Sequence, residues 1–299
     1  MRKIATKISK KLRKSQSKKI INLSEFKKYK QVLSQEFQTL QSADSLIKKG
    51  HNIQHAIYIS AQNILSLLIE ILSELRELDK LNKILGTSED MYTPSWPPMS
   101  PISNSSFFSW SAFDIRVGID KESYTSCIID NRHNLGLNDD ICHLITLMDA
   151  SRLGIYKVVD FAEDKWLLED LFNQKQYQCV GPADYPLNTG ELWLVRLLPP
   201  ISEPFDSHVI FTSPYILLEK ENEWLAFLNR NIKGIRPSPA AEEFYKQFMK
   251  HGLSHYYWLE FMMQGYSSHT DLSINLAGIP DIAASRPHRF DNQILTERL

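Results

Sequence analysis

The chain has 299 residues, 43% of them hydrophobic and 23% charged, a composition that excludes a disordered or fibrous protein and suffices for a packed core. The formal net charge of -1 conceals an asymmetry, because residues 1–19 carry nine Lys or Arg and no acid. The other residues therefore carry -10, the difference between -1 and +9. A basic segment on an acidic body often marks contact with an anionic partner.

Three cysteines, Cys127, Cys142 and Cys179, are widely spaced and form no CxxC pair, so the sequence indicates neither a disulfide framework nor a zinc knuckle. No signal-peptide core follows the basic start. The most apolar helix-like run, residues 64–72, is shorter than the roughly 20 residues that a membrane-spanning helix needs. We therefore predict a cytoplasmic protein without a transmembrane segment.

Residues 1–20 form a basic arm. Within it Ile4, Ile8 and Leu12 recur four residues apart, which would give a helix a narrow apolar stripe among lysines. A helix of this length is marginal alone, so we expect a solvated, frayed tail. The alternative is an arm that contacts nucleic acid or anionic lipid, although it holds no aromatic residue to stack on bases. Its candidate nucleic-acid-binding residues are Lys7, Lys10, Lys11, Arg13 and Lys14.

Residues 21–90 predict a helical lobe. Apolar side chains recur every three or four positions over 24–40 and again over 52–85, and Gly86 is the expected stop of the second, longer helix. The two helices would form a hairpin. Apolar residues crowd almost every face of its middle, so we expect another element, a protein partner or a second copy of the chain to cover it.

Residues 91–106 predict a proline-rich linker at the main domain boundary. Two PxxP spacings start at Pro94 and Pro98, and such spacings can present a polyproline II ligand to an aromatic groove. No basic residue flanks either spacing, so a linker with Trp96 packed against a neighbouring domain is the simpler interpretation.

Residues 107–299 predict an α+β domain. Apolar and polar residues alternate over 113–119, which is typical of a half-buried strand, and residues 124–129 could return beside it. A polar loop then precedes a helix that Asn138 or Asp139 can cap.

Residues 154–218 predict a small β-barrel within that domain. Strand patterns follow one another with short turns over 155–161, 166–172, 177–180, 191–198 and 207–218. Turns this short permit only antiparallel pairing, and closing such a sheet removes its exposed edges.

The C-terminal third predicts helices over 221–232 and 239–265. From Ser267 onward the periodicity is lost, which indicates a tail lying on the surface. The predicted fold class is therefore α+β, with an N-terminal helical hairpin, a central antiparallel sheet or small β-barrel, and C-terminal helices.

Metal and cofactor motifs are weak. Two HxxxH pairs, His51/His55 and His251/His255, lack the Glu that follows the first His in zincins, and a zinc site would need a third ligand. The sequence also contains no P-loop, GxGxxG or GxSxG motif. We predict neither a metal site nor a cofactor.

Asp130 and His133 are the candidate catalytic residues. They follow an expected strand, where a His with a carboxylate could act as the general base of a hydrolase-type enzyme. Asn and Asp in such a loop are also what turns and helix caps require. Cys179 lies inside an apolar strand, so we expect it to be buried and inert.

Aromatic rings of the barrel offer a second possible nucleic-acid surface, since small barrels with exposed rings bind single strands. The rings are Tyr156, Trp166, Tyr177 and Trp193. Acidic residues on the same strands, among them Glu169 and Asp170, would repel phosphates, so we expect the rings to form the core.

Three strings carry a resemblance to known chains: GIYKVV from Gly154, WLLEDLF from Trp166 and GELWLVRLLPP from Gly190. They resemble a β-module of uncharacterised bacterial proteins, some of them cyanobacterial, and the later strings AGIPD and SRPH resemble the ending of such chains. The resemblance covers about the last half of the chain. That group has no established activity, so the resemblance implies no site residues.

The leading hypothesis is a non-enzymatic interaction or regulatory protein that acts through its helical lobe and basic arm on a protein partner or a second copy. One alternative is a nucleic-acid (RNA) binding protein that uses the arm. Another is a hydrolase-type enzyme that uses Asp130 and His133.

Overall fold

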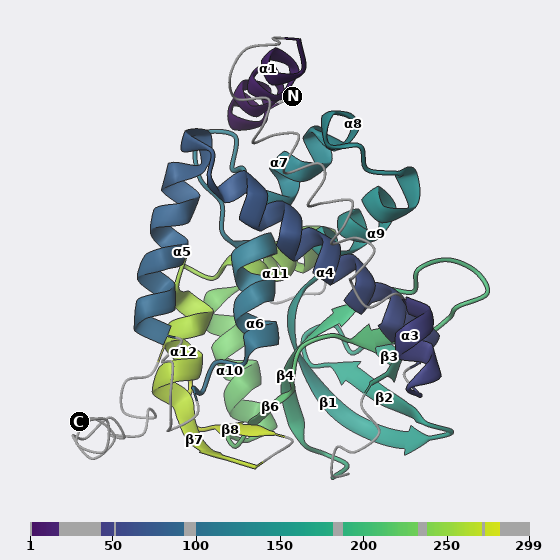
Figure 1. The fold of residues 1–299 in the computed structure, drawn as a ribbon. Coiled ribbons are helices and arrows are strands. Elements are labelled where there is room, and N and C mark those ends of the chain that lie inside the picture. The colour runs from purple at the N-terminus through teal and green to yellow at the C-terminus, as the bar shows by residue number, and fades with distance from the viewer. Residues whose placement is uncertain are drawn as a thin grey trace. The chain divides into compact units, whose positions relative to one another are not determined.

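The computed structural model describes residues 2–17, 43–50, 52–92, 100–181, 188–232, 238–270 and 273–281. The chain divides into two compact units. Unit 1 comprises Met1–Gly86 and Trp110–Ala150, and unit 2 comprises Thr87–Ser109 and Ser151–Leu299. The predicted α+β class with a small β-barrel is confirmed (Figure 1). The expected helix over 24–40 and residues 93–99 of the expected linker lie outside the described residues.

Unit 1 is mainly helical in its described part (Figure 1). Its elements are α1 (Lys3–Ser17), α3 (Ala43–Lys48), α4 (Ile53–Ser73), the 3-10 turn η1 (Arg76–Leu78), the start of α5 (Asp79–Tyr92), the π-helical turn η2 (Trp110–Asp114), α7 (Tyr124–Asp130), α8 (Arg132–Leu135) and α9 (Asp139–Ala150). α4 packs against α3, α7 and α9 and buries Ala61, Leu65 and Leu68. By length and composition α4 could also cross a membrane, a criterion that core helices of soluble proteins meet as well.

The single helix expected over 52–85 is wrong, because the structure has two helices there, α4 and α5. Asn52 caps α4, but α4 stops at Ser73, whose carbonyl oxygen accepts a hydrogen bond from Asn82 Nδ2. α5 then runs straight through Gly86, the residue expected to stop the helix. A glycine inside a helix costs about 1 kcal/mol relative to alanine, which neighbouring helical residues offset.

The strands expected over 113–119 and 124–129 are also wrong. η2 ends at Asp114, residues 115–119 form no strand beyond a single bridge between Val117 and Glu122, and α7 occupies the second segment. Ser123 and Ser126 form a capping box, in which each hydroxyl accepts the other residue's backbone N–H at 3.0 and 2.9 Å, and this starts α7. The first apolar side chains of the alternating pattern are nevertheless buried. The pattern thus predicts correctly that these side chains are buried, but it predicts the wrong secondary structure.

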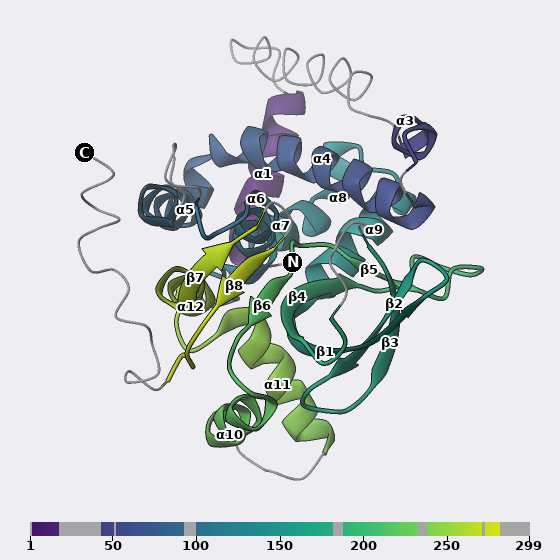
Figure 2. The ribbon, with the colours of Figure 1, turned by 90° about the horizontal axis from the view of Figure 1, so that it is seen from below.

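Unit 2 holds a closed five-stranded β-barrel (Figure 2). Its strands are β1 (Arg152–Ala162), β2 (Lys165–Asp170), β3 (Gln176–Val180), β4 (Leu192–Leu198) and β5 (His208–Ile210). They lie in the order β1-β2-β3-β5-β4, and β4 pairs again with β1, which closes the barrel. Only β3 and β5 pair in parallel among these strands. From β4 the sheet continues through β6 (Tyr215–Leu217) and β8 (Ile274–Leu276) to β7 (Tyr266–His269).

The interior of the barrel is packed with aromatic side chains. Trp166 and Trp193 are 1% exposed, with ring centroids 4.8 Å apart, while Tyr156 is buried and Tyr177 half-buried. Cys179 is buried among them, and burial raises the pKa of its thiol well above the ordinary value. The expectation that these rings form the core is confirmed, and the barrel is a packed scaffold.

The helices of unit 2 are α6 (Asn104–Ser109), α10 (Glu221–Asn231), α11 (Pro239–His251) and α12 (Tyr257–Gly265). The helix expected over 239–265 is interrupted at Gly252, which has a φ of +60°. The strand expected over 207–218 is two short strands, β5 and β6. The surface tail expected from Ser267 is wrong for 273–281, because β8 pairs with β6 and buries Ile274.

Candidate functional site

The described part of the basic arm, residues 2–17, is folded as helix α1 and belongs to unit 1. Its residues Ala5, Ile8 and Leu12 are at most 4% exposed, and α1 packs against α7, α8 and η1. The expected frayed tail is therefore wrong. An isolated helix of this length is marginal, but burial of its apolar stripe against other helices stabilises it.

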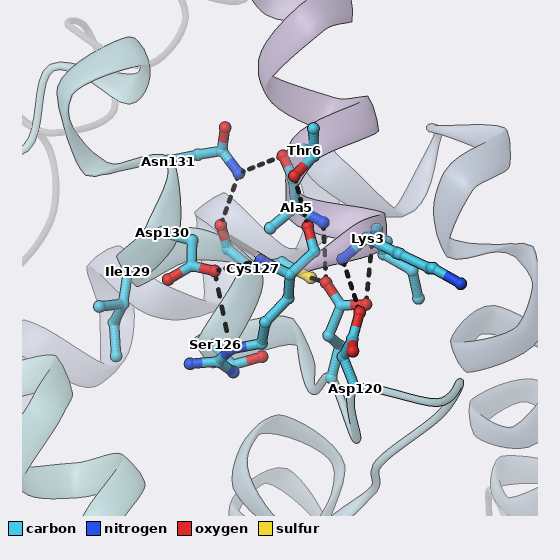
Figure 3. A network of polar contacts seen from close by, with 12 residues as sticks. Lys3, Ala5, Thr6, Asp120, Ser126, Cys127, Ile129, Asp130 and Asn131 are labelled. Atoms are coloured by element: carbon cyan, nitrogen blue, oxygen red, sulfur yellow. Dashed lines mark hydrogen bonds and ion pairs between the residues drawn. The ribbon is translucent and has the colours of Figure 1, made fainter.

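Two carboxylates hold the first turn of α1 through its backbone (Figure 3). Asp120 Oδ2 accepts the N–H of Lys3 at 2.8 Å. Glu122 Oε2 and Oε1 accept the N–H groups of Ile4 and Ala5 at 2.9 and 2.8 Å, and Glu122 is 1% exposed. The first N–H groups of a helix have no partner within it and carry partial positive charge, so these carboxylates satisfy both needs.

Side chains at the end of α7 hold the same turn from another direction (Figure 3). Asn131 Nδ2 donates to the carbonyl oxygens of Ala5 at 3.1 Å and of Cys127 at 2.9 Å. Asp130 Oδ2 lies 3.6 Å from Arg2 Nε. The turn is thus fixed by both hydrogen bonds and an ion pair.

Cys127 lies beneath this cluster. Its Sγ is 4.0 Å from Glu122 Oε1, and burial together with the Glu122 charge raises the pKa of the thiol to about 12. The thiol is therefore protonated at neutral pH, and its reactivity can report whether α1 is docked.

The opposite side of α1 is a basic face, which consists of the exposed residues Lys3, Lys7, Lys10, Lys11 and Arg13. Lys3, Lys7 and Lys10 are spaced four and three residues apart and so lie on one side of the helix. Lys11 Nζ lies 3.3 Å from Glu77 Oε2, whereas the other four side chains of the basic face make no ion pair with any described residue. Lys14 also belongs to α1, but its side chain lies outside the described part of the chain.

The chain matches no family model, and no curated protein or solved structure is significantly similar to it. The resemblance of its strands to a cyanobacterial β-module stays a prediction.

The candidate catalytic residues lie on neighbouring helices of unit 1. Asp130 ends α7 and its carboxylate faces Arg2, while His133 is exposed on α8. Within the described residues no hydrogen bond joins the two side chains. The pair therefore lacks the contact by which a carboxylate orients a general-base imidazole.

The HxxxH pairs do not form metal sites in the described part of the chain. His51 lies outside it, so only His55 on α4 is placed. His251 ends α11 and His255 follows the break at Gly252, so these two do not share a helix face. No three His, Cys, Asp or Glu side chains among the described residues are grouped as metal ligands.

Proposed function

We propose that this protein is a non-enzymatic interaction protein that binds a polyanionic partner through the basic face of α1. The observation that carries the proposal is the arrangement of α1 itself. Its apolar side is buried, its first turn is held by Asp120 and Glu122, and four of its exposed cations make no ion pair with a described residue.

Fixed cations favour binding for two reasons. A helix already ordered by unit 1 loses little backbone entropy when a partner binds, so more of the electrostatic attraction appears as affinity. Cations that make no ion pair with a described residue also avoid exchanging one ion pair for another. α1 itself contains no Asp or Glu, so no charge within the helix offsets its lysines.

The test is retention of the full chain on a resin carrying inorganic polyphosphate. We expect the native protein to be retained and released by salt, and the variant Lys7→Gln/Lys10→Gln/Arg13→Gln to pass through. The matched control, Lys80→Gln/Lys220→Gln/Lys246→Gln, removes the same charge from exposed positions outside α1 and should be retained like the native protein.

Retention of the α1 variant at the native salt concentration would contradict the proposal. Neutral substitutions are preferable to deleting α1, because deletion would also remove Ile8 and Leu12 from the core of unit 1. Circular dichroism of each variant checks that the fold is intact.

A further inference from the structure

We infer that the polyanionic partner is a nucleic-acid duplex, which α1 contacts along the phosphate backbone without reading base sequence. This inference rests on the proposed function and names the partner's class. Three observations support it: the exposed side of α1 is the basic one, its exposed residues are mostly lysines, and the helix that carries them is ordered.

The buried side of α1 argues against a membrane surface. An amphipathic helix binds a bilayer by placing its apolar side among the lipid chains. In α1 that side is used within unit 1, where Ala5 and Ile8 are 0% exposed. α1 could therefore bind a lipid surface only through the charge of its basic face.

The residue types of the basic face argue against an acidic protein. Protein interfaces are enriched in Tyr, Trp and Arg, which supply buried anchors, and are depleted in Lys. Every exposed side chain from Lys3 to Arg13 is basic, and four of these five are lysines. No exposed apolar anchor stands among them.

The absence of rings on α1 argues against single strands. Proteins that bind single-stranded nucleic acid combine a basic groove with aromatic side chains on which unpaired bases stack. Residues 2–17 contain no aromatic residue. In a duplex the bases are already stacked, so phosphate contacts suffice.

The rigidity of α1 suits a duplex. From residue 3 to residue 13 the helix rises about 15 Å. A duplex carries one charge per roughly 1.7 Å of its axis, about twice the density of a single strand, so that length of duplex holds about nine phosphates. A row of cations on a rigid helix gains most from a partner whose charges are dense and fixed.

The predominance of lysine on the basic face also predicts that α1 does not distinguish base sequences. Lysine binds phosphate as a point charge, whereas bidentate recognition of guanine is mainly the work of arginine. Arg13 is the one arginine of the basic face. The contact is therefore with the backbone, which DNA and RNA duplexes share.

The test measures fluorescence anisotropy of the full chain with a mixed-sequence duplex of about two helical turns, as DNA and as RNA. Single strands of the same length, poly-glutamate and vesicles containing phosphatidylserine are compared at the same salt. We expect both duplexes to bind more tightly than these probes, regardless of sequence. Between about 50 and about 200 mM salt the affinity should fall about 10²-fold, as four phosphate contacts require.

Tighter binding of single strands, poly-glutamate or vesicles than of duplex would overturn the inference. A preference for one base sequence would also overturn it, if the Lys7→Gln/Lys10→Gln/Arg13→Gln variant showed the same preference. Retention on polyphosphate without duplex binding leaves the proposed function standing and removes this inference, whereas loss of both removes both.

Discussion

Four exposed cations of α1 differ from the ion-paired cations of unit 2 in what surrounds them. In unit 2, Lys157 Nζ lies 2.8 Å from Glu221 Oε2, and Lys175 Nζ lies 2.9 Å from Glu242 Oε1, so each ties a strand segment to a helix. On α1 four exposed cations have no such partner among the described residues. The ion pairs of unit 2 belong to its fold, while the charge of α1 stays available to a partner.

The acids of unit 1 show how this difference arises. Asp120 and Glu122 bind backbone N–H groups of α1 and leave its lysine side chains alone. The helix is therefore anchored through its backbone and its apolar side. The backbone and the apolar side chains of α1 hold it in place, while its lysine side chains carry the exposed charge.

The largest expected effect concerns Cys127. With a pKa of about 12, its thiolate fraction near pH 8 is about 10³-fold below that of an ordinary thiol, and burial slows its reaction further. A pulse of iodoacetamide followed by peptide mass analysis should label half-buried Cys142 first, with Cys127 labelling still rising above pH 10. Equal labelling of Cys127 and Cys142 in the folded protein would contradict the burial of Cys127 in unit 1.

The next effect tests the buried side of α1. Ile8→Ala removes a side chain that is 0% exposed, and such a change typically costs about 2–5 kcal/mol. The neighbouring Lys7→Ala change at an exposed position should stay within about 0.5 kcal/mol. Urea unfolding measures both, and equal costs would contradict a docked α1.

A smaller effect tests the anchoring carboxylate. Glu122→Gln replaces the charged acceptor of two backbone N–H groups in a buried site, which should cost about 1–3 kcal/mol. The same change should speed labelling of Cys127 for two reasons: loss of the Glu122 charge lowers the pKa of the thiol, and the first turn of α1 would open more often. Glu77→Gln, at a partly exposed ion pair, is the matched control and should do neither. Unchanged stability and labelling in Glu122→Gln would show that the carboxylate does not hold α1.

The smallest effect tests an ion-paired cation of unit 2. Arg230 makes two hydrogen bonds to the carboxylate of Asp281, at 3.0 and 3.1 Å, but its side chain is 43% exposed. Arg230→Ala should therefore cost about 0.2–1 kcal/mol, less in high salt, and leave polyphosphate retention unchanged. Loss of retention in this variant would break the distinction between paired and unpaired cations.

Local patterns predict most of unit 2. The strands expected over 155–161 and 166–172 correspond to β1 and β2, and a two-residue hairpin loop joins them, in which Glu163 and Asp164 both have positive φ. Alternating apolar residues and short turns are properties of neighbouring residues, so the sequence displays them. The parallel pairing of β8 with β6 joins distant segments and is not visible locally.

The candidate site is predicted only in part for the same reason. The basic residues of α1 are evident from composition. Its docking depends on Glu122 and Asn131, which lie more than one hundred positions along the chain, 118 from Ile4 and 126 from Ala5. One signal is present in the sequence: the basic segment holds no acid of its own that could accept the first N–H groups of its helix.

The most direct measurement is the salt dependence of duplex DNA affinity for the native chain and for Lys7→Gln/Lys10→Gln/Arg13→Gln. Each phosphate contact contributes about -0.9 to the slope of log affinity against log salt, so four contacts predict about -3.6 and the variant about -0.9. Equal slopes for two folded proteins would contradict the account, because the unpaired cations of α1 would then have no part in binding.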